Sequence, residues 1–209
     1  MKKAGLALDI DETLSWTLGY WFEKMQELFG NPEGLSVKEQ VKKYRYAENV
    51  PYWQAEEINA WKEKQRESSK LQEKLPLIKN ADIYVAKINK IIPIIAYITN
   101  RPTAAIPGTK KWLKTHGFPD VPIYNRPEGI GYIDGNKWKV KLLIELYPKV
   151  VGIVDDNPGL LNFLPKSYKG KVFIYDFKGK LKPGKNIYNC KDWPETYEKI
   201  LKSFPHSQV

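Results

Sequence analysis

Two pairs of aspartates each follow a short apolar run in the sequence. Asp9 and Asp11 end the stretch "GLALDID", and Asp155 and Asp156 end the stretch "VVGIVDD". Carboxylates that lie close together repel one another unless a cation or a shared proton relieves the repulsion. A single aspartate at a strand end is often only a cap or a turn residue, but two pairs in equivalent positions indicate a site. The sequence therefore predicts a carboxylate cluster that holds a cation.

The side chains available in the chain restrict which cation this cluster suits. There is one cysteine, Cys190, and there are two histidines, so the chain cannot build a cysteine-based metal site or an internal disulfide. Oxygen ligands without thiols suit Mg²⁺, which keeps several waters and usually takes one or two protein carboxylates. We therefore expect a magnesium site, and we treat Cys190 as a packing residue.

The composition is that of an ordinary soluble globular protein, with 42% hydrophobic and 28% charged residues in a chain of 209. No run reaches the roughly 18 apolar residues of a membrane span, and the opening "MKKAGLALDIDE" meets acid too early for a signal peptide, so we expect a cytoplasmic location. The formal net charge of +10 favours an anionic partner. Basic residues never run longer than two in a row, so we expect a small phosphorylated substrate, with nucleic acid less favoured and no membrane partner.

The elements that must position these carboxylates follow from the pattern of apolar residues. Runs typical of strands cover residues 4–10, 94–98, 121–124, 150–154 and 172–177. Segments typical of helices cover residues 82–91, 109–115, 136–147, 158–164 and 193–204. This alternation predicts an α/β fold with a parallel sheet covered on both faces. Ligands of such sheets bind off the carboxyl ends of the strands, where Asp9, Thr99 and Asp155 would meet.

One long interval, residues 15–77, breaks this alternation. It contains no convincing strand, and it is rich in Glu, Lys, Gln and aromatic residues. Apolar residues such as Trp21, Met25 and Phe29 recur at helical spacing. The sequence therefore predicts a small helical insertion over residues 15–77, and an α/β core made of residues 1–14 and 78–209.

The order of the motifs resembles that of the haloacid dehalogenase superfamily, whose phosphatases carry DxDx[TV], then a Ser or Thr after a strand, then a Lys, then paired acids. Here "DIDET" at 9–13 is followed by Thr99, by a lysine near position 137 and by Asp155-Asp156. The resemblance implies a Rossmann-like, three-layer fold in which the helical insertion is a cap. The ending "VFIYDFKGKLKPGKNIYNCKDWPETYEKI" is also similar to the 5′(3′)-deoxyribonucleotidase-like group, which implies a nucleotide substrate.

The resemblance also implies a role for each acidic residue. Asp9 would be the nucleophile that forms an aspartyl-phosphate, and Asp11 would be the general acid and then the general base. Mg²⁺ would be held by Asp9, by the backbone carbonyl of Asp11 and by Asp155, with Asp156 acting directly or through water. An aspartate two positions after the nucleophile separates phosphatases and mutases from dehalogenases. The expected activity is therefore Mg²⁺-dependent hydrolysis of a phosphomonoester.

Groups that bind the phosphate are expected around the second strand and in the insertion. Thr99 offers a hydroxyl, and the loop amide of Asn100 follows it. Arg101 stands next to a proline in "TNRP", and we interpret it as a solvated turn residue. Trp16 follows the first motif closely, and we expect it at the hinge, facing the pocket as a substrate contact.

The lysine of the third motif has three candidates in "GNKWKVKLLIELYP": Lys137, Lys139 and Lys141. At about 100° per residue, one face of this helix would be apolar and would pack on the sheet. That face consists of Val140, Leu143, Ile144 and Tyr147. We select Lys137 because it lies in the first turn, nearest the strand ends, and Lys139 and Lys141 stay open as alternatives.

Two other functions fit the same sequence. The charge of +10 and the basic and aromatic residues of the insertion would suit a phosphatase that acts on nucleic-acid ends. A non-catalytic binding protein on the same fold is the other alternative, although the complete set of acids disfavours it. The sequence does not distinguish hydrolysis from phosphotransfer, and it does not specify the substrate or the oligomeric state.

Overall fold

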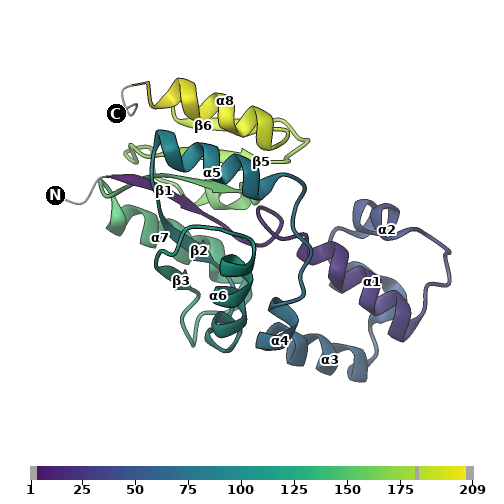
Figure 1. Cartoon of the computed structure of the whole chain (residues 1–209). Coiled ribbons are helices and arrows are strands. Elements are labelled where there is room, and N and C mark those ends of the chain that lie inside the picture. Colours follow the sequence, from purple (N-terminus) through teal and green to yellow (C-terminus); the bar gives the residue numbers. More distant parts are fainter. Residues whose placement is uncertain (1–3, 182–183, 206–209) are drawn as a thin grey trace.

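A computed structural model describes residues 4–181 and 184–205. Its centre is a six-stranded sheet in which every neighbouring pair is parallel, in the order β3-β2-β1-β4-β5-β6 (Figure 1). The strands are β1 (Gly5–Leu8), β2 (Ile94–Thr99), β3 (Ile123–Asn125), β4 (Val150–Asp155), β5 (Lys171–Tyr175) and β6 (Ile187–Cys190). Because β2 and β4 flank β1 on opposite sides, the strand order reverses direction at β1, which is where open α/β sheets bind ligands.

Helices pack on both faces of the sheet, as the alternation of elements predicts. One face is covered by α5 (Ala81–Ile91), α6 (Ile106–Thr115) and α8 (Trp193–Ser203), and the other by α7 (Gly135–Leu146) and the short 3-10 helix η5 (Pro158–Asn162). Side chains of β1 alternate between the two layers, with Leu6 and Leu8 in the first core and Ala7 in the second. The fold is therefore the expected three-layer α/β arrangement. Within residues 4–181 and 184–205, no helix has the length and apolar character that a bilayer span requires.

Five α-helices lie between β1 and β2 in the chain, and all of them except α5 stand to the right of the sheet in Figure 1. Those to the right are α1 (Thr17–Phe29), α2 (Val37–Tyr44), α3 (Glu56–Arg66) and α4 (Ser69–Gln72). This segment has an apolar cluster of its own, made of Phe22, Met25, Ala47, Val50, Trp53 and Ile58. The rings of Phe22 and Trp53 meet edge to face, with centroids 5.4 Å apart. Several aromatic side chains of this segment therefore serve its internal packing.

The C-terminal part of the sheet differs from the sequence-based prediction. Strand β6 extends the sheet beside β5, in a stretch that the sequence presents as loop-like. Of its four residues only Cys190 is fully buried, because an edge strand needs no continuous apolar run. The predicted helix 158–164 is the shorter η5. Asp192 caps the N-terminus of α8, since its Oδ1 accepts a hydrogen bond of 2.9 Å from Glu195 N.

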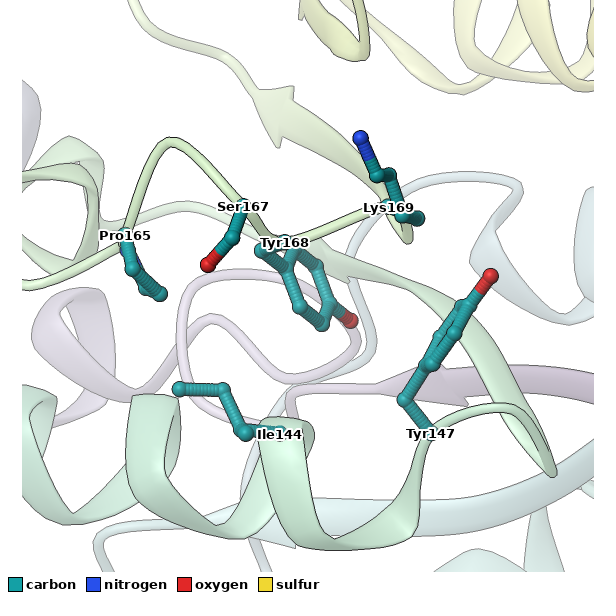
Figure 2. A pocket seen from close by; sticks show the side chains of 6 residues that line it. All are labelled: Ile144, Tyr147, Pro165, Ser167, Tyr168 and Lys169. Atoms are coloured by element: carbon teal, nitrogen blue, oxygen red, sulfur yellow. The ribbon is translucent and has the colours of Figure 1, made fainter.

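Helix α7 presents a different face to the sheet from the one the sequence predicts. Its buried residues are Gly135, Lys139, Val140 and Leu143, whereas Ile144 is 45% exposed and Tyr147 is 39% exposed. Ile144 and Tyr147 instead line a shallow hollow of about 120 Å³ together with Tyr168 (Figure 2). The helix is therefore turned so that the position of Lys139, rather than that of Ile144, lies toward the sheet.

Candidate active site

The carboxyl ends of three neighbouring strands bring the predicted residues together. Asp9 directly follows β1, Thr99 ends β2 and Asp155 ends β4. Asp9 N donates a hydrogen bond of 2.9 Å to Val154 O, so the chain stays beside β4 past the end of β1. As a result, Asp9, Asp155 and Asp156 each offer a carboxylate oxygen within 4.8 Å of the others.

Lys139 bridges two of these carboxylates. Its Nζ lies 2.8 Å from Asp9 Oδ1 and 2.8 Å from Asp155 Oδ2, and all three side chains are buried. Burial alone would lower the pKa of Lys139, but the two carboxylates raise it above its ordinary value. Lys139 therefore stays charged in the site.

The structure places Lys139, and not the selected Lys137, among the carboxylates. Lys137 is exposed on α7, and Lys141 lies in the solvent 3.9 Å from Glu145. The sheet-facing set predicted from periodicity excludes Lys139, because the prediction assumes that every residue of the buried face is apolar. In the structure Lys139 occupies one position of that face, where Asp9 and Asp155 replace the water around its ammonium group.

The carboxylates carry more negative charge than their lysine balances. Burial raises the pKa of Asp9 to about 7, with Lys139 opposing the shift and Asp155 adding to it. Burial also raises the pKa of Asp156 well above its ordinary value, and the charge of Asp155 adds to this. Three hard oxygen donors with uncompensated charge are a set that fits a divalent cation of the Mg²⁺ type.

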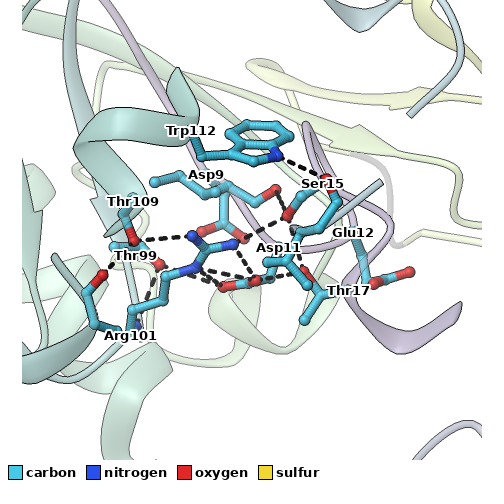
Figure 3. Close-up of polar contacts among 12 residues, drawn as sticks. Asp9, Asp11, Glu12, Ser15, Thr17, Thr99, Arg101, Thr109 and Trp112 are labelled. Carbon is cyan, nitrogen blue, oxygen red and sulfur yellow. Dashed lines mark hydrogen bonds and ion pairs between the residues drawn. The ribbon is translucent and has the colours of Figure 1, made fainter. Parts of the chain in front are cut away.

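Asp11 lies outside this cluster because it has a cation of its own. Arg101 Nε donates to Asp11 Oδ1 at 3.2 Å and to Oδ2 at 3.1 Å, and Nη2 donates to Oδ1 at 2.7 Å (Figure 3). Burial would raise the pKa of Asp11, but the charge and hydrogen bonds of Arg101 outweigh it and hold this pKa below its ordinary value. The Asp11 carboxylate therefore does not join the three described metal-ligand candidates, which leaves only its backbone carbonyl for the predicted metal contact.

Arg101 is a site residue that sequence reasoning missed. Its side chain is 4% exposed, and it also donates to Thr109 Oγ1 at 2.9 Å and to Ser15 Oγ at 3.1 Å. These partners come from the loop after β1 and from α6, so a local sequence pattern around Arg101 does not predict them. One signal was present: only four of the 34 basic residues are arginines. An arginine within the second motif of a lysine-rich chain suggests that its guanidinium binds a carboxylate or a phosphate through two hydrogen bonds.

Thr99 and Asn100 lie beside this ion pair. Thr99 is fully buried, and its Oγ1 accepts a hydrogen bond of 3.2 Å from Arg101 N and lies 3.5 Å from Asp11 Oδ2. The Asn100 side chain packs over Gly135, where an added Cβ would lie 2.4 Å from Asn100 Oδ1. Glycine at the start of α7 therefore allows the segment around Asn100 and helix α7 to approach closely.

Asp11 and Glu12, which follow Asp9, hold the first turn of α1. Asp11 Oδ1 accepts a hydrogen bond of 2.6 Å from Thr17 Oγ1, and Glu12 Oε1 accepts one of 2.6 Å from Leu18 N. Burial raises the pKa of Glu12 to about 8. The ring of Trp16 packs against Gly19, where an added Cβ would lie 2.2 Å from it. Trp16 thus lies at the start of α1, as expected for a hinge residue. The contact described for its ring is with α1 and not with the predicted pocket.

Comparisons with known proteins bear on the fold. No protein-family model matches the chain, and no curated protein is similar enough in sequence to count as a match. Among solved structures, a dehalogenase with an intermediate complex is similar with a TM-score of 0.57 at 13% identity, over 97% of each chain. A putative beta-phosphoglucomutase from Thermotoga maritima gives 0.55 at 18% identity, over 96% of this chain and 99% of that one.

A haloacid dehalogenase-like family hydrolase from Xanthomonas campestris gives a TM-score of 0.50 at 10% identity, over 98% of this chain and 97% of that one. At such low sequence identities the similarity shows the fold but not the reaction or the substrate. The chain therefore has the α/β, Rossmann-like fold of haloacid dehalogenase hydrolases.

Proposed function

We propose that the protein is a Mg²⁺-dependent phosphomonoester hydrolase that works through an aspartyl-phosphate at Asp9, with Asp11 as general acid and base. The observation that carries this proposal is the different pairing of two nearby carboxylates. Asp9 contacts Lys139 within the acidic cluster, and Asp11 contacts Arg101 outside it. Two carboxylates in different electrostatic environments can take two roles, one as nucleophile and one in proton transfer.

In the first step, a carboxylate oxygen of Asp9 attacks the phosphorus of the substrate and forms a P–O bond. The bond from phosphorus to the ester oxygen breaks, and that oxygen leaves with a proton from Asp11. Thr99 Oγ1, Asn100 N and Lys139 Nζ donate to the phosphoryl oxygens. In the second step, Asp11 takes a proton from a water whose oxygen attacks phosphorus, which releases phosphate and restores Asp9.

The pairing with Arg101 suits Asp11 to the second step, because a carboxylate with a lowered pKa is ionised. To act as an acid in the first step, Asp11 has to gain a proton when the substrate arrives. The negative charge of the phosphate supplies a reason, since it competes for the Arg101 guanidinium and raises the pKa of the carboxyl group beside it.

Asp9, Asp155 and Asp156 are the residues that would hold Mg²⁺, with the Asp11 carbonyl as the proposed backbone ligand. Bound there, the ion supplies positive charge that keeps Asp9 ionised and stabilises the charge on the transferring phosphoryl group. The raised pKa values of Asp9 and Asp156 support this assignment, because they are what uncompensated carboxylates display.

We infer that residues 15–77 form a cap, and that the described residues 4–14, 78–181 and 184–205 form the core. The chain leaves and returns side by side, since Trp16 N donates to Pro76 O and Ile78 N donates to Leu14 O, both at 2.8 Å. A separate apolar cluster supports the same division. A cap that excludes water suits a small phosphorylated substrate, and a nucleotide is the preferred case.

The test is phosphate release by the purified protein with Mg²⁺ from aryl phosphates, sugar phosphates, nucleotides and phosphorylated oligonucleotides. We expect turnover that stops with EDTA and in Asp9→Asn. Circular dichroism of the variant should match that of the wild type. Failure to release phosphate from any member of the panel would contradict the proposal.

A further inference from the structure

Two neighbouring apolar side chains stand out on the surface near the candidate active site. Tyr132 is 64% exposed and Ile133 is 89% exposed, the two highest values among the large hydrophobic residues that the structure describes. They lie in the short 3-10 helix η4 (Tyr132–Asp134). Helix α7, which carries Lys139, starts at the next residue, Gly135. An exposed apolar pair beside a polar site suggests a surface that something else covers.

The loop that carries Tyr132 is fixed to the phosphate motif. Arg126 donates from Nε to Asn100 O at 3.2 Å, and from Nη1 to Ile130 O. Asp134 N donates to Gly131 O at 3.1 Å. These bonds connect the backbone around Tyr132 to the residue that follows Thr99. The exposure of Tyr132 is therefore built into an ordered loop.

Arg66, from helix α3, faces Tyr132 across the space between the core and the helical segment. Its Cζ lies 5.8 Å from the centroid of the Tyr132 ring and 6.0 Å from that of Trp21. Its charge is paired with Glu48 and Glu63. Because two glutamates balance this guanidinium, it offers a flat surface more than a free positive charge.

The side chain of Tyr132 lies within the electrostatic reach of Asp11. Partial desolvation raises the pKa of Tyr132 to about 12, and the charge of Asp11 adds to this shift. The residue thus has an exposed body and a hydroxyl group within the electrostatic reach of the proposed general acid.

We propose that Tyr132 is a specificity residue whose exposed ring stacks on a planar aromatic part of the leaving group. The inference rests on the proposed function and adds the substrate class, namely phosphomonoesters of aromatic groups. A flat aromatic surface suits a planar ring. It offers little to an aliphatic group or to a second phosphate.

The test compares the binding of phenylphosphonate and methylphosphonate to the full-length protein with Mg²⁺, measured by calorimetry. Neither ligand has an ester bond to hydrolyse, so binding is separate from turnover. We expect the wild type to bind phenylphosphonate more tightly by roughly 5- to 150-fold, the range expected when stacking on one aromatic side chain contributes.

Tyr132→Ala should remove this preference and leave the affinity for methylphosphonate unchanged. Tyr132→Phe should keep it, because the ring is retained. Ile133→Ala is the matched control, since it deletes an exposed apolar side chain from the same loop and should keep the preference. Circular dichroism verifies that each variant is folded.

Equal affinity of the wild type for the two phosphonates would overturn the inference. So would a preference for the phenyl compound that survives in Tyr132→Ala. Absence of phosphate release in a turnover assay would contradict the proposed function, whereas this binding ratio would still decide the role of Tyr132.

Discussion

Arg101 binds both carboxylate oxygens of Asp11, a residue 90 positions earlier in the chain. Two residues before Asp11, Asp9 is bound by a different cation, Lys139. The two carboxylates of the first motif therefore pair with different cations, although they are close in sequence. The candidate site depends on this pairing, and each cation can be tested by itself.

Replacing Arg101 should affect both stability and turnover. Arg101→Ala leaves the partly buried Asp11 carboxylate without its cation, and we expect a loss of roughly 2–4 kcal/mol in the free energy of unfolding. Turnover should fall because Asp11 is no longer held in position. Urea unfolding and steady-state kinetics measure the two effects. Arg101→Lys keeps the charge but not the fork, so it should be intermediate, and an Arg101→Ala protein equal to the wild type would contradict this role.

Lys139 and Lys137 form a matched pair on one helix. Lys139→Met leaves Asp9 and Asp155 without their bridging charge, and we expect a loss of roughly 3–5 kcal/mol in EDTA, together with nearly complete loss of phosphate release. Lys137→Met removes an exposed charge and should change stability by about 0.5 kcal/mol or less. Denaturant titrations and activity assays on both variants decide the matter. The reverse ranking would restore Lys137 as the phosphate ligand.

A divalent cation should stabilise the fold through the acidic cluster. At a Mg²⁺ concentration about 100 times the Kd, binding adds about 2.7 kcal/mol, which raises Tm by roughly 5–10 °C for a chain of this length. Asp156→Asn should raise Tm in EDTA, because it removes an acid whose ionisation the neighbouring carboxylates oppose, and should reduce the shift caused by Mg²⁺. Thermal scans with Mg²⁺ and with EDTA test this. Asp120→Asn, an exposed acid outside the cluster, should behave like the wild type, and a wild-type Tm independent of Mg²⁺ would argue against the site.

The raised carboxyl pKa values predict how stability changes with pH when no metal is bound. The folded protein holds protons on Asp9 up to a pKa of about 7 and on Glu12 up to about 8, against ordinary values of 3.8 and 4.5. The unfolded chain releases these protons at lower pH. The contribution of these two groups to stability is therefore greatest below about pH 4 and is lost as the pH rises toward 8. The lowered pKa of Asp11 acts only in more acidic solution.

Glu12→Gln isolates one part of this effect, because Glu12 is not a proposed ligand or catalytic residue. Urea titrations with EDTA give the free energy of unfolding of the variant minus that of the wild type. This difference should be more positive at pH 8 than at pH 5. The same difference between variant and wild type at both pH values would show that the Glu12 carboxyl does not titrate as described.

The sheet could be predicted from the sequence because its central strands are continuous apolar runs between helical segments. The edge strand β6 could not, since three of its four residues are only partly buried and their sequence resembles a loop. The acids of the site were also predictable, because each directly follows a buried strand. The pattern of apolar residues shows where each strand ends, and the strand ends determine where these acids lie.

The two cations of the site were harder to predict, for physical reasons. Lys139 occupies a buried position in which a hydrophobic residue is expected, and only the carboxylates of other segments make that position favourable. Arg101 is stabilised by Asp11, Ser15 and Thr109, which only the fold brings together. Both residues depend on long-range electrostatics, which helical periodicity and local motifs do not encode.

The central claim is that Asp9 carries the phosphoryl group during turnover. The most direct measurement quenches the reacting protein in acid within its first turnovers of an aryl phosphate, and locates the added phosphoryl group by peptide mass spectrometry. The account predicts the group on the peptide that contains Asp9, labile to hydroxylamine and missing from the Asp9→Asn protein. Release of phosphate by the wild type with no phosphorylated Asp9 at any time, or with the group on another residue, would contradict it.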